Sequence, residues 1–278
     1  MYVIRKKRYT TVRRGASVAE QTNIPMSYSE HGQGDPIVLL HAFPLNGGMW
    51  EPQASALKDE YRVVIPDYPG FGKSSYSPVR PDIDYFAENV RKLLDELELD
   101  RVVLGGLSMG GYVAFACLRL FPERISALIL ANTRPDPDSE EARENRDNMA
   151  RRVSEDGIEV LVEMQMERLL SPNTLENNQE VVDKVETLML ESSPDGVVAA
   201  LGAMRDRPNS KPLLPKIEVP TLVVGGEEDA ISSPEVMGEM AASIPGSIHH
   251  TISGAGHLSN MEAPEEFNDV LRNFLTKL

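Results

Sequence analysis

Short apolar runs of the kind found in buried strands alternate with helical periods along most of this chain. The runs are "PIVLLHAF" (36–43), "YRVVIPD" (61–67), "RVVLGGL" (101–107), "RISALILAN" (124–132) and "PTLVVGGEED" (220–229). Because they are rich in β-branched residues and lack polar alternation, they suit a parallel sheet covered on both faces. Strands that alternate with helices predict a doubly wound, mostly parallel α/β sheet.

Amphipathic helical periods separate these runs. In "DYFAENVRKLLDELEL" (84–99) the residues at 3.6-residue spacing are Phe86, Val90, Leu93, Leu94 and Leu97. Near the end of the chain the same spacing joins Phe267, Val270, Leu271, Phe274 and Leu275, and Pro264 suits the first turn of that helix. Two further segments, "IPMSYSEH" (24–31) and "SIHHTIS" (247–253), are predicted to be strands.

The alternation stops between residues 134 and 213. Four stretches with helical spacing lie there, near 139–153, 157–170, 175–191 and 194–205, and no strand pattern is convincing. We interpret 134–213 as an all-helical cap inserted into an α/β core formed by 1–133 and 214–278. The cap contains five of the twelve methionines, namely Met149, Met164, Met166, Met189 and Met204. Methionine packs cores and lines adaptable pockets equally well, so both roles stay open.

Charge narrows the range of partners. The net charge is −15, yet six of the 28 Lys and Arg residues lie within the first 14 positions, where no acidic residue occurs. The rest of the chain therefore has 22 basic and 43 acidic residues, a charge of −21. Such a body repels phosphate backbones, which argues against nucleic acid as the main partner. Residues 1–20 form an N-terminal extension with no assigned role.

Apolar segments and cysteine usage point to a cytoplasmic protein. No apolar stretch reaches the roughly 18 residues that a membrane span needs, and no signal-peptide pattern follows the basic start. Cys117 is the single cysteine, so an intrachain disulfide is impossible. Its position in an apolar helix predicts a small buried residue. The sequence leaves the oligomeric state open.

Ser108 lies in "GLSMGG" (106–111), where a predicted strand ends and a predicted helix begins. A sharp strand-to-helix turn strains its central residue and crowds the positions two before and two after it. Only small residues fit there, which accounts for Gly106 and Gly110. The turn exposes the hydroxyl beside the first helical N–H groups. This context predicts that Ser108 is a nucleophile rather than an incidental serine in a turn.

A serine nucleophile needs a base, and the chain has five histidines: His31, His41, His249, His250 and His257. His257 follows the last predicted strand in a loop of small residues, so it should lie at the carboxyl edge of the sheet. His249 and His250 lie inside that strand, where structural roles are expected. His31 ends a predicted strand before a turn and is expected to lie at the surface. Placement therefore selects His257 as the base.

The base needs an orienting carboxylate. Asp229 enters a loop after the strand that precedes the one leading to His257, and its neighbours Glu227 and Glu228 could compete. Asp136 and Asp138, after an earlier strand, are a second option. The chain order Ser108, Asp229, His257 is the order expected for α/β-hydrolases.

An oxyanion hole is expected from two backbone N–H groups. The loop "HAFPLNGG" (41–48) can direct the N–H of Phe43 toward an oxygen that also binds the N–H of Met109. His41 is interpreted as a residue that shapes this loop by hydrogen bonding to backbone, not as a catalytic group.

"DYPGFGKS" (67–74) ends like a phosphate-binding P-loop. That motif needs glycine where this chain has Asp67, whose charge would lie where phosphate binds. The segment after it is not helical, so we reject a nucleotide-binding role and expect a surface loop near the site.

The pieces "HAFP", "DYPGFGKS", "GLSMGG", "GGEEDAISSP" and "AGHLSNMEAPEEFN" together resemble the α/β-hydrolase superfamily over residues 24–278, closest to small esterases and 3-oxoadipate enol-lactonases. The resemblance implies the α/β-hydrolase fold with a helical cap. It also implies a Ser108, Asp229 and His257 triad with Phe43 and Met109 as oxyanion donors. The sequence departs at Ala42, where the family usually has glycine.

The expected reaction is hydrolysis of small-to-medium carboxylic esters or lactones through an acyl-enzyme, with no cofactor and no metal. The same triad could instead serve C–C bond hydrolysis, perhydrolysis or acyl transfer, and a non-enzymatic ligand receptor on this fold is a third possibility. We expect Met164, Met166 and Leu258 to contact the substrate. The cap has 18 acidic and 10 basic residues, so anionic substrates should be disfavoured unless Arg134, Arg168 or Arg205 points inward.

Overall fold

A computed structural model describes residues 26–76 and 80–278 of the protein, and the N-terminal extension lies outside them. Its seven-stranded sheet has the order β1-β3-β2-β4-β5-β6-β7. The strands are β1 (Tyr28–His31), β2 (Asp35–Leu40), β3 (Tyr61–Pro66), β4 (Val102–Leu107), β5 (Ile125–Ala131), β6 (Thr221–Gly226) and β7 (Ile248–Ile252). Only β1 is antiparallel to its neighbour, so the predicted doubly wound, mostly parallel sheet is confirmed.

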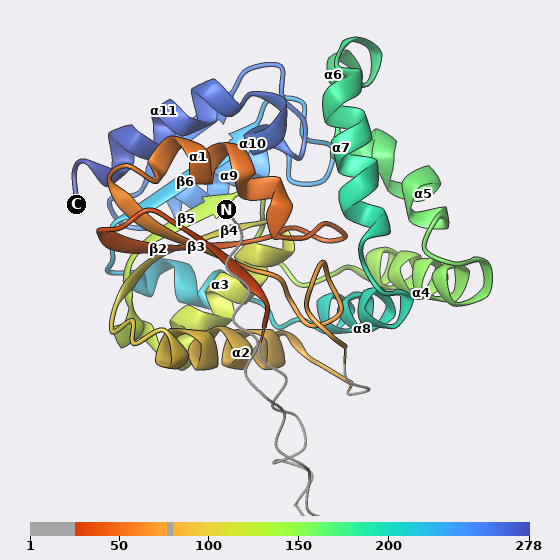
Figure 1. Ribbon diagram of the computed structural model, residues 1–278, viewed down its shortest axis with the longest axis horizontal. Coiled ribbons are helices and arrows are strands. Elements are labelled where there is room, and N and C mark those ends of the chain that lie inside the picture. Colours follow the sequence, from red (N-terminus) through yellow and green to blue (C-terminus); the bar gives the residue numbers. More distant parts are fainter. Residues whose placement is uncertain (1–25, 77–79) are drawn as a thin grey trace, which may run out of the picture.

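Helices cover both faces of this sheet (Figure 1). α2 (Ile83–Glu96) and α3 (Met109–Leu120) cover one face, whereas α1 (Glu51–Leu57) and α11 (Pro264–Leu275) cover the other. Their apolar residues face the sheet at the predicted spacing: Phe86, Val90, Phe267 and Leu271 are all buried. Shorter helices are η2 (Gly47–Trp50), η3 (Pro122–Arg124), η4 (Lys211–Lys216), α9 (Pro234–Ala242) and α10 (Ser259–Glu262). No helix in the described part of the chain is long and apolar enough to cross a membrane.

The segment between β5 and β6 is helical, and Figure 1 shows its main helices beyond one edge of the sheet. They are α4 (Glu140–Asp156), α5 (Val160–Leu169), α6 (Pro172–Asn177), α7 (Gln179–Leu190) and α8 (Pro194–Arg205). The single helix predicted over 175–191 is wrong. The chain breaks at Asn178, whose non-helical backbone (φ −130°, ψ 71°) lets its side chain accept a hydrogen bond from the N–H of Val181 and begin a new helix. We keep the word cap for residues 134–213.

The cap meets the core where two glycine backbones touch. The N–H of Ser193 donates to the carbonyl of Gly70 (2.8 Å). A Cβ atom on Gly196, in the first turn of α8, would lie 2.6 Å from the Cα of Gly70. Real Cβ atoms do not approach backbone so closely, so this contact requires glycine on the cap side. Gly70 has a φ of +90°, a backbone conformation that residues with side chains rarely adopt.

Two alanine substitutions in α8 test this close approach. Gly196→Ala should lower the free energy of unfolding by about 2 kcal/mol, because the backbones must separate. Gly202→Ala is the matched control in the same helix. Its Cβ would meet nothing within 4 Å, so replacing glycine inside a helix should raise stability by about 1 kcal/mol. Denaturant unfolding of both variants measures their free energies of unfolding. Equal values would show that the contact between Gly196 and Gly70 is not tightly packed.

Candidate active site

Ser108 lies in a strained turn between β4 and α3. Its φ of +55° and ψ of −111° fall outside the regions that L-residues favour. A Cβ atom on Gly106 would overlap the carbonyl of Gly110, and one on Gly110 would overlap the carbonyl of Leu40. The two glycines are therefore required by close backbone contacts, as the sequence indicated. Strain of this kind persists only where the surrounding structure fixes it, and it is concentrated at functional sites.

His257 is hydrogen-bonded to Asp229. The imidazole Nδ1 lies 2.9 Å from Oδ1 and 2.8 Å from Oδ2 of the carboxylate. Both residues are buried, with 1% and 3% of their surfaces exposed. Because a carboxylate only accepts, Nδ1 carries a proton, and the neutral imidazole therefore has its lone pair on Nε2. The histidine is therefore held in the tautomer that a general base requires.

Four donors surround the Asp229 carboxylate. Besides His257, the N–H groups of Ile231 (2.7 Å) and Ser232 (2.9 Å) donate to Oδ1, and Nδ2 of Asn132 donates to Oδ2 (2.9 Å). Burial raises the pKa of this carboxyl. The charge and hydrogen bond of His257, together with the bonds from Asn132 and Ser232, outweigh burial and hold its pKa below the ordinary value. Asp229 is therefore ionised at neutral pH.

The other candidate acids have different partners. The Asp138 carboxylate pairs with Arg146 and Arg207, and Asp136 pairs with Lys211 (2.6 Å). Glu227 accepts hydrogen bonds from Ser253 and Gly254 at the surface. Neither aspartate nor this glutamate is bonded to His257, so Asp229 alone among them is joined to the predicted base.

The predicted oxyanion donors follow the ends of two neighbouring strands, β2 and β4. Phe43 follows β2, whose last residue is Leu40, and Met109 is the first residue of α3. Among the described residues, neither backbone N–H donates to another protein group. Ala42, the departure from the usual glycine, is fully buried, and its N–H lies 3.1 Å from Sδ of Met49.

His41 shapes this loop, as the sequence predicted. Its Nε2 accepts from the N–H of Tyr68 (3.0 Å), so Nδ1 carries the proton that is donated to the carbonyl of Ala42 (3.0 Å). The ring also packs against the ring of Tyr68, with centroids 4.4 Å apart. Burial lowers the pKa of His41 to about 4, so it is neutral in the folded protein.

The cap is hydrogen-bonded to the loops that carry Phe43 and His257, and no local sequence pattern indicates these contacts. On one side Ser192 Oγ donates to the carbonyl of Pro44 (3.1 Å). On the other side the N–H of Leu258 donates to the carbonyl of Leu169 (3.1 Å). Glu262 joins the cap to the segment around His257. Its carboxylate accepts hydrogen bonds from the N–H of Gly256 in the core (2.9 Å) and from the N–H of Ser171 in the cap (2.8 Å).

The three residues predicted to contact the substrate differ in their burial. Leu258 is fully buried beside the base, whereas Met164 and Met166 on α5 are half-buried. Of the arginines considered as inward cations, Arg134 donates to the carbonyl of Ile231 (2.6 Å) and Arg205 pairs with Asp147 and Asp206.

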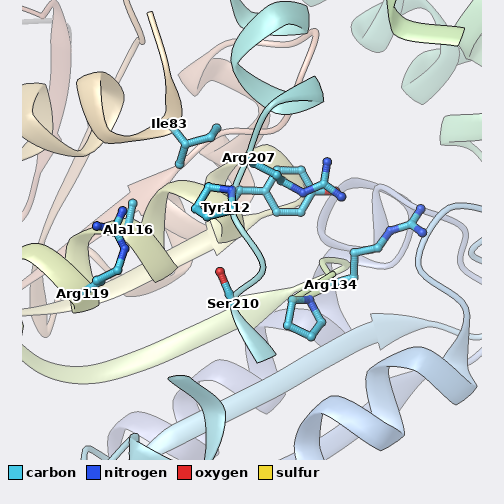
Figure 2. Close-up of a pocket in the computed structure, with 9 residues that line it drawn as sticks. Ile83, Tyr112, Ala116, Arg119, Arg134, Arg207 and Ser210 are labelled. Atoms are coloured by element: carbon cyan, nitrogen blue, oxygen red, sulfur yellow. The ribbon is translucent and has the colours of Figure 1, made fainter. Parts of the chain in front are cut away.

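A different arginine is buried at the base of the cap. Arg207 is 4% exposed, and its guanidinium carbon lies 4.1 Å above the ring of Tyr112. Arg207 and Arg146 share the carboxylate of Asp138, so two cations face one anion. Figure 2 shows the adjoining pocket between α3 and the segment that carries Arg207 and Ser210. Its volume of about 10 Å³ admits roughly one water molecule.

The P-loop-like segment is built around Asp67. The carboxylate accepts hydrogen bonds from the N–H groups of Gly47 (2.8 Å) and Lys73 (2.9 Å). The backbone N–H of Lys73, at the lysine position of the P-loop-like pattern, is therefore occupied by a side chain of the protein itself.

Comparison with known proteins identifies the family. The family described as the alpha/beta hydrolase fold matches residues 35–264. The chain is also 30% identical over 251 residues to 3-oxoadipate enol-lactonase 2 of Acinetobacter baylyi, across 88% of this chain and 91% of that protein. The protein belongs to the α/β hydrolase family.

Solved structures agree with this assignment. A thermophilic esterase from Thermogutta terrifontis, solved with malate bound, has a TM-score of 0.91 at 43% identity, across 94% of this chain and 96% of that one. An enol-lactonase from Burkholderia xenovorans LB400 has a TM-score of 0.84 at 27% identity, across 90% and 96%. The predicted resemblance to small esterases and enol-lactonases is confirmed.

The buried neutral His41 predicts a loss of stability in mild acid. An unfolded histidine has a pKa near 6.5, whereas burial lowers the pKa of His41 to about 4. The unfolded chain therefore binds a proton as the pH falls below about 6.5, and the folded protein does so only near 4. From pH 7 to pH 5 this difference should lower the free energy of unfolding by about 2 kcal/mol.

Urea unfolding at pH 7 and pH 5 measures this contribution. His41→Gln, which keeps an amide donor and acceptor, should lose less stability over this interval than the wild type does. His250→Gln removes an exposed histidine and serves as the control. A pH dependence in His41→Gln equal to that of the wild type would contradict the assignment.

Proposed function

We propose that this protein is a serine hydrolase that cleaves small-to-medium carboxylic esters or lactones through an acyl-enzyme. The observation that carries the proposal is the buried hydrogen bond between His257 and Asp229. Both follow strands parallel to β4, so they belong to the same sheet edge as the strained turn of Ser108. A buried imidazole with a charged carboxylate on Nδ1 is the arrangement that activates a serine hydroxyl.

In this mechanism Ser108 Oγ attacks the ester carbonyl carbon while Nε2 of His257 takes the hydroxyl proton. Asp229 stabilises the imidazolium that forms and does not itself take up the proton. The N–H groups of Phe43 and Met109 bind the oxyanion of the tetrahedral intermediate. The imidazolium then protonates the departing alcohol and leaves an acyl group on Ser108. Water, deprotonated by His257, hydrolyses that acyl-enzyme and restores the serine.

Ester and lactone hydrolysis require the same steps, because a lactone is a cyclic ester whose leaving alcohol stays attached to the acyl group. Relatives named as esterases and enol-lactonases support both substrate classes. The single cysteine, Cys117, is fully buried, which is compatible with the cytoplasmic location that we propose.

Removing the nucleophile tests the proposal. Ser108→Ala should lower kcat for p-nitrophenyl esters by about 10⁶-fold, because a triad fails as a unit. The purified variant should keep the circular dichroism spectrum of the wild type. Ester turnover by Ser108→Ala within tenfold of the wild type would exclude Ser108 from the reaction.

A second variant tests the acid. Asp229→Asn should lower kcat for the same esters by about 10⁴-fold. The control is Asp136→Asn, which changes a surface carboxylate that is paired with Lys211.

The acyl preference follows from the cap. Its half-buried methionines offer an adaptable apolar surface, and its excess of acidic residues disfavours anionic substrates on approach. We therefore propose that modestly hydrophobic acyl chains are preferred. The buried Arg207, which shares Asp138 with Arg146, is the feature that opposes this expectation.

A substrate panel decides between these two influences. kcat/KM should be highest for butyrate and octanoate esters and at least tenfold lower for a lactone that carries a carboxylate. If the carboxylated lactone is preferred and its kcat/KM falls steeply with salt, an arginine defines the pocket. Arg207→Met and Arg168→Met, a buried and an exposed arginine of the cap, would then show which region supplies the charge.

A further inference from the structure

Asn132 is a buried residue that none of the proposed catalytic roles uses. It follows the last residue of β5, between the ends of β4 and β6. Its side chain is fully buried, and its φ of +43° lies in the left-handed region, where asparagine is among the better tolerated residues. A buried amide in a strained backbone position requires partners that compensate for both costs.

Within the described chain, the partners of this amide are in the loop that carries Asp229 and in the segment around His257, which includes the first residue of α10. Nδ2 donates one hydrogen to Oδ2 of Asp229 (2.9 Å) and the other to the carbonyl of Gly256 (3.2 Å), the residue before His257. Oδ1 accepts the hydroxyl of Ser259 (2.6 Å), two residues after His257. The Asp229 carboxylate and the Gly256 carbonyl fix the orientation of the amide, because both only accept and therefore must face Nδ2.

We propose that Asn132 is a positioning residue that holds the acid and the base in register from the end of β5. One nitrogen is bonded to both loops, so a shift of either loop would break a buried hydrogen bond. This role rests on the proposed hydrolase function, since it acts through Asp229 and His257 and not on the substrate.

The amide also keeps the acid charged. A hydrogen bond donated to a carboxylate stabilises the ionised form. Asparagine is suited to this place, because an aspartate of the same shape would present an acceptor to Oδ2 of Asp229. Two carboxylates at that distance would repel each other, and the pair would retain a proton at a higher pH.

The decisive variant is Asn132→Asp, which keeps the side-chain shape and tolerates the left-handed backbone. We expect kcat for p-nitrophenyl butyrate to fall at least tenfold, with KM within threefold of the wild type. We also expect the carboxyl ¹³C resonance of Asp229 to titrate at least one pH unit higher. Ser259→Ala is the milder second variant. It removes the hydrogen bond that Oδ1 of Asn132 accepts and should lower kcat several-fold.

Asn89→Asp is the matched control, because Asn89 is also buried and donates to a backbone carbonyl, that of Tyr85 in α2. This control should lower the melting temperature and leave both kcat and the Asp229 titration unchanged. If Asn132→Asp keeps kcat within twofold of the wild type, Asn132 only fills the core and the inference is overturned.

The titration needs no substrate, so it separates this inference from the proposed function. If the wild type hydrolyses no ester but the Asp229 titration moves in Asn132→Asp, the hydrolase proposal fails while the coupling between Asn132 and the acid stands. If the titration does not move, the coupling fails as well.

Discussion

The candidate site depends on keeping one carboxylate charged inside the protein. Asp229 is almost completely buried, and an ionised carboxylate is costly to bury unless donors surround it. Its four donors come from three places: the loop that follows β6, the end of β5 and the loop that follows β7. The parallel sheet brings these places together, because the carboxyl ends of neighbouring parallel strands meet at one edge. The ionised state of Asp229 therefore depends on donors from the ends of three neighbouring strands.

The cap is bonded to the same two sides of the site. Ser192 is hydrogen-bonded to the loop that carries Phe43. Leu169 is hydrogen-bonded to Leu258, the residue after His257, and Ser171 to Glu262 in α10. Glu262 accepts backbone N–H groups from the core and the cap at once. These bonds give the cap a structural role beside any role in binding substrate, because they support loops that carry proposed catalytic groups.

Local sequence patterns correctly predicted those elements whose structure depends on residues within the element itself. The spacing of apolar residues predicted α2 and α11, and the crowding around Ser108 predicted the turn between β4 and α3. The same reasoning failed for 175–191, because its helical spacing continues across Asn178 while the side chain of Asn178 caps a new helix. Capping is a local event, but asparagine inside a periodic stretch gives only a weak signal of it.

By itself the sequence determined the parallel sheet, the helical nature of the insert and the candidate nucleophile, because hydrophobic period and glycine spacing act over a few residues. It left several carboxylates open as the acid. Only the tertiary structure decided that Asp229, and not Asp136 or Asp138, is bonded to His257. It also decided that Asn132 joins the acid loop to the base loop, and that the cap is bonded to both sides of the site. These contacts join residues up to 148 positions apart, and their distances depend on how whole strands pack, which no local pattern encodes.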